Sequence, residues 1–260
     1  MKNLFTALLF TGSITAAATT AQAQSAITFG PRLGLNISSF SYNGTPQQFD
    51  DVKHIVGVQA GGTANISFGG GRLAFQPSVL FTQKGAELKS AGASENNGFP
   101  FTYSVTATPK INFIEVPLNF VYTSGGDHGF QVFAGPYVAF GVGGGGSYTV
   151  DFKSTDPALS FYNQQYPGSL RVEYGANQNP NDNPQTSALT GAPTLILTFH
   201  RFDAGLNAGV GYRVGPFQAQ LGYGLGLINF VPNDPDGNDT GSKGYHRSFQ
   251  LAANYFFGGK

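Results

Sequence analysis

Six charged residues stand out because each interrupts a stretch of otherwise apolar or small residues. They are Arg32, Lys84, Glu115, Arg201, Asp203 and Arg213. Ionisable groups of both signs in apolar surroundings can pair with one another, transfer protons as general acids and bases, or line a path for ions. An unpaired buried charge is costly and pairing is the usual remedy, so the sequence favours an ion-paired core over a catalytic or gating site.

A second candidate for chemistry is the acidic stretch NDPDGND (233–239). It offers the oxygen ligands Asp234, Asp236 and Asn238 at the alternate spacing of a calcium-binding loop. The glycine expected at the sixth position of such a loop is missing, and Tyr245 stands where the twelfth-position glutamate belongs. We therefore interpret the stretch as a solvated turn and expect no bound metal.

Nucleophilic catalysis finds little support. The chain has no G-x-S-x-G motif and no cysteine, and His54, His200 and His246 are scattered along it. The run GGGG (143–146) is not followed by the Lys-Ser/Thr and helix of a phosphate-binding loop, so it is interpreted as flexible backbone. We expect neither an enzyme nor a cofactor.

The composition differs from that of a soluble enzyme. Only 11% of the residues are charged, whereas 37 Gly, 24 Phe and 12 Tyr are in excess. The 14 Lys and Arg residues balance the 14 Asp and Glu residues, so no basic field is available for nucleic acid. Without cysteine the chain can form neither disulfides nor an acylated lipoprotein N-terminus.

Strict alternation of apolar with polar or small residues recurs along the chain. The alternating segments are 27–38, 56–68, 73–84, 114–122, 130–142, 202–212, 217–227 and 249–257. They are close to the 9 to 11 residues that a tilted strand needs to cross a bilayer, and longer than ordinary soluble strands. The six charges lie on the face opposite the apolar one, which in a membrane barrel is the lumen. We expect Arg213 at the periplasmic rim, Arg32 near mid-lumen and the other four in the upper half.

The connections give an independent signal, because short and long ones alternate strictly. The short ones are 69–71, 124–127 and 213–216, and the long ones are 42–54, 85–110, 143–200 and 229–246. Periplasmic turns and extracellular loops alternate in this way in outer-membrane barrels. With this polarity, every segment carries an outward aromatic residue at its periplasmic end. This predicted girdle is Phe29, Phe68, Phe75, Tyr122, Phe130, Tyr212, Phe217 and Phe257.

Two features complicate the pattern. Four prolines fall inside expected strands, where each should remove a ladder hydrogen bond, so we expect bulges or twisted edges at Pro31, Pro77, Pro117 and Pro136. In addition, 194–199 alternates out of phase with 202–212, so either a bulge lies near His200 or the strand begins after it. The segment 169–175 could form a hairpin with 194–199, which makes ten strands the alternative to eight.

The N-terminus predicts export. Lys2, an apolar stretch and the Ala21-Gln22-Ala23 cleavage site form a signal peptide over residues 1–23, so the mature protein begins at Gln24. The remaining 24–260 has the length of one barrel domain.

Several segments together carry a family resemblance: LAFQPSVLFTQKGAEL, INFIEVPLNFVY, FQVFAGPYVAFGV, FDAGLNAGVGYRVGPFQAQLGYGLGLINF and FQLAANYFF. In their order and spacing they resemble the PorT-like, porin-annotated family of bacterial outer-membrane β-barrels. The resemblance implies an OmpA- or OmpX-like eight-stranded antiparallel transmembrane β-barrel with long extracellular loops. The ending GGK departs from the aromatic last residue usual in such barrels, which leaves Phe257 as the terminal signal.

One barrel architecture hosts many roles, so fold does not give function. We expect an outer-membrane protein of structural or surface-interaction type, without catalysis. The alternatives are a narrow porin or secretion component, and a surface barrel enzyme. We expect the protein to be a monomer whose partners are outer-membrane lipid and the outer-membrane insertion machinery. The sequence does not identify an extracellular ligand or a secretion partner.

Overall fold

The structure is a computed structural model that describes residues 27–43, 49–68, 71–96, 99–178 and 194–258. The predicted signal peptide, residues 1–23, lies outside the described residues. The described chain is all-β apart from turns and short 3-10 segments such as η2 (Pro157–Tyr162). No helix within the described ranges has the length and apolar character needed to cross a membrane.

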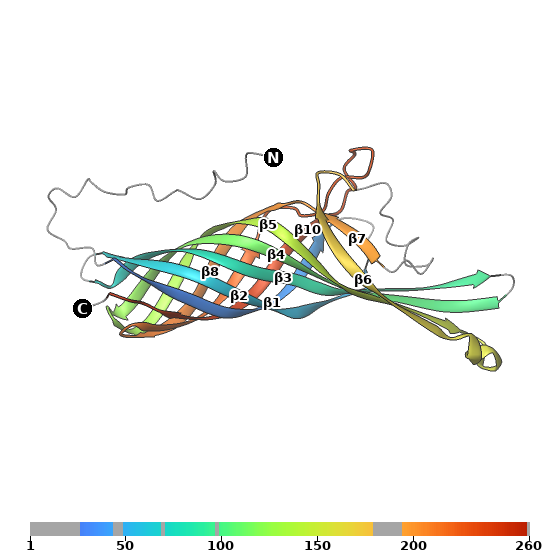
Figure 1. The fold of residues 1–260 in the computed structure, drawn as a ribbon, viewed down its shortest axis with the longest axis horizontal. Helices are drawn as coiled ribbons and strands as arrows, with labels where there is room; N and C mark the ends of the chain where they lie inside the picture. Colours follow the sequence, from blue (N-terminus) through green and yellow to red (C-terminus); the bar gives the residue numbers. More distant parts are fainter. Residues whose placement is uncertain (1–26, 44–48, 69–70, 97–98, 179–193, 259–260) are drawn as a thin grey trace, which may run out of the picture.

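Eight strands of the described chain form a closed antiparallel ring (Figure 1). In spatial order they are β1 (Ile27–Asn43), β2 (Asp51–Phe68), β3 (Leu73–Asn96), β4 (Phe99–Gly125), β5 (His128–Ser154), β8 (Phe202–Val214), β9 (Phe217–Gly226) and β10 (Lys243–Tyr255). Around the ring, strands that follow one another in the sequence pair with each other, except that β5 pairs with β8. The pairing of β1 with β10 closes the ring. The predicted eight-stranded barrel is confirmed.

The ring is apolar outside and polar inside, the reverse of a soluble domain. Outward side chains such as Phe130 and Leu251 are 75% and 57% exposed. Inward positions one residue away, such as Gln131 and Gln250, are buried. Because successive side chains of a strand point to opposite faces, the alternation in the sequence becomes this inside-out wall directly.

β3, β4 and β5 continue well beyond the ring on one side (Figure 1). β3 and β4 stay paired from Leu73↔Tyr122 to Asn96↔Phe99, and β4 stays paired with β5 as far as Phe101↔Ser154. The long connections of the sequence are therefore partly sheet. Because the sequence predicts that these connections are extracellular, we call the part of these strands above the ring, together with β6 and β7, the extracellular extension.

β6 (Gln164–Tyr174) and β7 (Thr194–Phe199) lie outside the ring, so the ten-strand barrel is wrong. β5 separates from β8 after Phe140↔Phe202, and its released edge pairs with β6. β7 then pairs with β6 in parallel, which corrects the expected hairpin. β8 begins at Phe202, which confirms the prediction that this strand begins after His200.

The expectation of bulges at the prolines is wrong. The register shifts of the ring fall between His54 and Gln59, between Asn112 and Phe113, and between Thr123 and Gly125. At Pro117 the ladder loses pairs but resumes in the same register. A proline removes a donor without adding a residue, and the two neighbouring strands hold the register.

The aromatic residues predicted as a periplasmic girdle point out of the wall. Seven of them are between 43% and 75% exposed, and Phe75 is half-buried against Phe120, with ring centroids 5.1 Å apart. Neighbouring strands bring some of them into edge contact, as between Phe130 and Tyr212 at 5.1 Å. A band of this kind is typical of a membrane interface.

Candidate functional site in the barrel lumen

Three of the six singled-out charges meet in the upper lumen, inside the ring on the side of the extracellular extension. Lys84 of β3 places its Nζ atom 2.7 Å from Oε2 of Glu115 on β4 and 3.4 Å from Oδ2 of Asp203 on β8. All three side chains are buried. One ammonium group therefore lies between two carboxylates, and we call this set the lysine cluster.

Tyr137 of β5 completes the cluster. Its hydroxyl donates a hydrogen bond of 3.0 Å to Oδ2 of Asp203, and its ring lies under the ammonium group with Nζ of Lys84 4.4 Å from the centroid. Room for the ring comes from Gly205 on β8, where an added Cβ would lie 2.7 Å from a ring carbon. The Phe113 ring also faces the ammonium group, with its centroid 5.5 Å from Nζ, so the cation is held by two acids and two aromatic rings.

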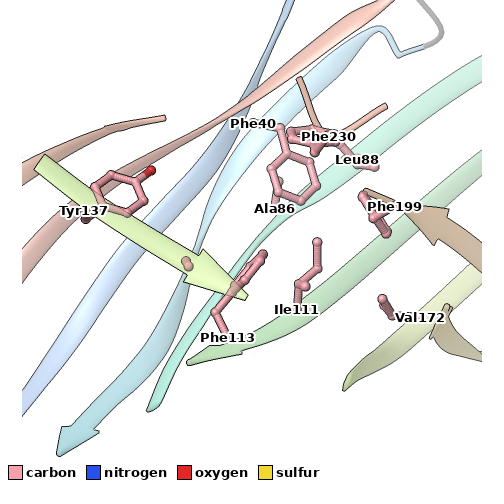
Figure 2. Packing of buried hydrophobic residues seen from close by; sticks show 10 residues of the cluster. Phe40, Ala86, Leu88, Ile111, Phe113, Tyr137, Val172, Phe199 and Phe230 are labelled. Carbon is pink, nitrogen blue, oxygen red and sulfur yellow. The ribbon is translucent and has the colours of Figure 1, made fainter. Parts of the chain in front are cut away.

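Aromatic side chains pack together next to the lysine cluster, and we call them the aromatic plug; Figure 2 shows Phe40, Phe113, Phe199 and Phe230 of this packing. Phe40 and Phe230 have ring centroids 4.8 Å apart, and Phe199 lies 5.6 Å from Phe230. The imidazole of His246 is buried between Phe230 at 4.8 Å and Phe113 at 5.3 Å. Phe230 follows β9 and Phe199 ends β7, so segments beyond the ring supply part of this plug.

The lower lumen is filled differently, by amides and hydroxyls. Arg32 donates from Nη1 to Gln220 at 2.6 Å and from Nε to Gln59 at 3.3 Å. Gln76 and Gln218 exchange two hydrogen bonds of 3.1 Å across the lumen. We call these residues the amide layer. Its side chains come from strands on opposite sides of the ring, so they fill the lumen from wall to wall.

The formal charges in the described lumen balance, with Arg32 and Lys84 against Glu115 and Asp203. Among the described residues, no carboxylate lies within salt-bridge distance of Arg32, but Glu115 attracts it through the lumen. All four side chains are at most 3% exposed. A general acid or base must come within hydrogen-bond reach of its substrate, and no solvent-exposed group is present here. The geometry fits a structural ion cluster.

Arg201 does not lie in the lumen, which corrects the expectation drawn from its parity. It precedes β8 in a bend and is exposed. Its guanidinium carbon lies 5.4 Å from the ring centroid of Phe140 and 5.1 Å from that of Tyr174. Arg213 is half-buried at the opposite end, where its Nε donates to the Gly215 carbonyl at 2.9 Å and its guanidinium faces Phe256.

The other candidate residues are engaged locally. The Asp234 carboxylate accepts hydrogen bonds from the backbone and side-chain nitrogens of Asn238, and the backbone bond holds the pKa of this carboxyl below its usual range. Both ring nitrogens of His200 face backbone carbonyls, at 3.0 and 3.4 Å. Among the described residues, no group of three or more His, Asp or Glu side chains could hold a metal ion.

Comparison with known proteins gives a family and distant structural relatives. The family model described as outer membrane protein beta-barrel domain matches residues 21–231. Among curated proteins no match is found. Ail, the attachment invasion locus protein of Yersinia pestis, solved with the heparin analogue sucrose octasulfate, is 12% identical, with 89% of this chain and 99% of the Ail chain covered and a TM-score of 0.34. OprB of Pseudomonas putida is 9% identical, with 88% and 94% covered and a TM-score of 0.19.

The family match covers most of the chain, including most of the strands that form the ring. It agrees with the apolar outer wall and the closed antiparallel sheet described above. The chain belongs to the outer membrane protein β-barrel domain family and is a protein of the bacterial outer membrane.

Proposed function

We propose that this protein is a surface barrel that holds an extracellular β-sheet away from the membrane for interaction with other molecules. The observation that carries the proposal is the continuity of β3, β4 and β5, which run without a break from the membrane wall into the extracellular extension. Paired strands are stiffer than loops, so a surface built on them keeps its shape at a distance from the lipid.

The filled lumen supports a role in display rather than transport. The lysine cluster and the aromatic plug lie next to each other inside an eight-stranded ring, a size at which side chains are sufficient to fill the interior. A PorT-like role as a narrow transport or secretion component is the alternative, and a conductance measurement separates the two. We propose no catalysis, and a monomer inserted into lipid by the outer-membrane insertion machinery.

The test is a shortened extension. Replacing residues 91–104 with a tight turn joins β3 to β4 where Ser90 pairs with Val105, and leaves the ring intact. Cells that carry the shortened protein should retain a folded, heat-modifiable barrel and lose the attachment or self-aggregation conferred by the full-length protein. Equal attachment by both forms, measured at equal surface levels, would contradict the proposal.

A further inference from the structure

The outer wall carries basic residues just above the lipid-facing aromatic residues of the upper rim. Phe140 and Phe202 pair across β5 and β8 and are 51% and 48% exposed, as expected at the outer membrane interface. Arg201 comes directly before Phe202 and is exposed. Its contacts with the rings of Phe140 and Tyr174 hold the guanidinium at this boundary. Such stacking reduces the side-chain freedom that binding would otherwise cost.

Lys110 and Arg171 lie higher on the same side. Lys110 is exposed on β4, four residues above Ile114, which corresponds to about 13 Å along a strand. Its cross-strand partners are Gly85 on β3 and Gly145 on β5, so no side chain stands directly opposite it. Gly145 is paired in turn with Arg171 on β6. One row of the sheet therefore presents two cations separated by a position without a side chain.

One acidic group pairs with this row and another is engaged away from it. Glu173 lies 3.4 Å from Nε of Arg171, an exposed pair of the kind that contributes little in water, and Glu87 lies 3.6 Å from Nζ of Lys53. Within the part of the chain that the structure describes, no carboxylate lies within salt-bridge distance of Lys110 or Arg201. Neighbouring strands are about 4.8 Å apart, so Lys110 and Arg171 are about 10 Å apart at their Cα atoms. Two long side chains at that distance can both reach the same phosphate group.

We propose that Lys110, Arg171 and Arg201 bind the phosphate groups of a phosphorylated lipid headgroup in the outer leaflet. The assignment to a lipid, and not to free phosphate, rests on position. The acyl chains of such a lipid would lie against the apolar wall directly below, at Phe140, Phe202 and Leu206. Arginine suits phosphate because its planar fork donates two parallel hydrogen bonds, and lysine adds a point charge.

The test is lipid binding to the detergent-purified, folded protein, measured by native mass spectrometry. The probes are diphosphorylated lipid A, its dephosphorylated form and inorganic phosphate. We expect wild type to retain diphosphorylated lipid A at least about tenfold more tightly than the dephosphorylated form. The triple variant Lys110→Gln, Arg171→Gln, Arg201→Gln should lose this preference. Lys243→Gln is the matched control, because Lys243 is exposed at the same end of the barrel on β10.

Equal binding of diphosphorylated lipid A by wild type and the triple variant would overturn the proposal. So would equal binding of both lipids by wild type, which would indicate acyl-chain adsorption alone. Displacement of bound lipid A by inorganic phosphate at equal concentration would indicate a soluble anion site instead. The three single variants repeat the measurement if the triple variant does not refold, and each should reduce the preference in part.

Discussion

Among the residues that the structure describes, two lysines each lie between two carboxylates, one inside the barrel and one on its surface. Lys84 lies 2.7 and 3.4 Å from its acids, with all three side chains at most 2% exposed. Lys53 lies 3.6 Å from both Asp51 and Glu87, with side chains 35% to 55% exposed. Each set consists of one lysine, one aspartate and one glutamate. Losing a partner should be costly in the lumen and nearly neutral on the surface, because water can replace the lost partner only on the surface.

Lys84→Met should have the largest effect on stability. It leaves Glu115 and Asp203 buried side by side without their cation, and removing one partner of a buried ion pair costs about 3–5 kcal/mol. The temperature at which the folded band converts to the unfolded band in gel electrophoresis should fall clearly. An unchanged transition temperature would mean that the two acids have other partners.

Glu115→Leu should weaken the barrel somewhat less. Lys84 then keeps Asp203 and the Tyr137 ring, so the cation loses its shortest contact but not its whole surroundings. We expect a loss of about 3 kcal/mol in urea unfolding. Adding Lys84→Met to this variant should lower the free energy of unfolding further, because Asp203 then stays buried without its cation. Recovery of stability in the double variant would show that Lys84 and Asp203 do not stabilise each other.

Gln218→Leu probes the amide layer, where the substitution breaks neutral hydrogen bonds and no ion pair. Gln76 loses two hydrogen bonds but keeps its bond to Asn65 of 2.8 Å. A neutral buried hydrogen bond contributes about 1 kcal/mol, so the free energy of unfolding should fall by about 1–2 kcal/mol. A loss as large as that of Lys84→Met would remove the distinction between charged and neutral lumen layers.

Lys53→Met should have the smallest effect. Exposed ion pairs contribute about 0–1 kcal/mol and are screened by salt. The variant should unfold within error of wild type at moderate ionic strength, as judged by the same gel-shift assay. A loss comparable to that of Glu115→Leu would show that exposure does not separate the two lysines.

The wall of the barrel follows from the sequence because alternation is a local property. Parity fixes the face of each residue in a strand, so the sequence alone predicts that Lys84, Glu115 and Asp203 lie in the upper lumen. Parity fails where a strand ends, so it gives the wrong position for Arg201, because β8 begins one residue after it. The parallel pairing of β6 with β7 likewise depends on the edge that β5 releases, which no local pattern encodes.

Which side chains contact one another in the lumen is harder to predict than which face of the wall each side chain occupies. Tyr137 has inward parity, and surrounding glycines signal space for a large ring, so its place beside Lys84 was within reach of sequence reasoning. The aromatic plug was not, because Phe199 and Phe230 come from segments outside the alternating strands. The contact between Arg32 and Gln220 joins residues 188 positions apart and requires the closed ring.

We propose that the lysine cluster and the aromatic plug seal the lumen, so that the barrel displays its extension and does not conduct. The direct measurement is the conductance of purified, refolded wild-type protein in planar lipid bilayers, with an open porin as positive control. The account predicts insertion without a steady ionic current, since ions would have to displace paired charges and packed rings. A large, stable conductance in the wild-type protein would contradict it.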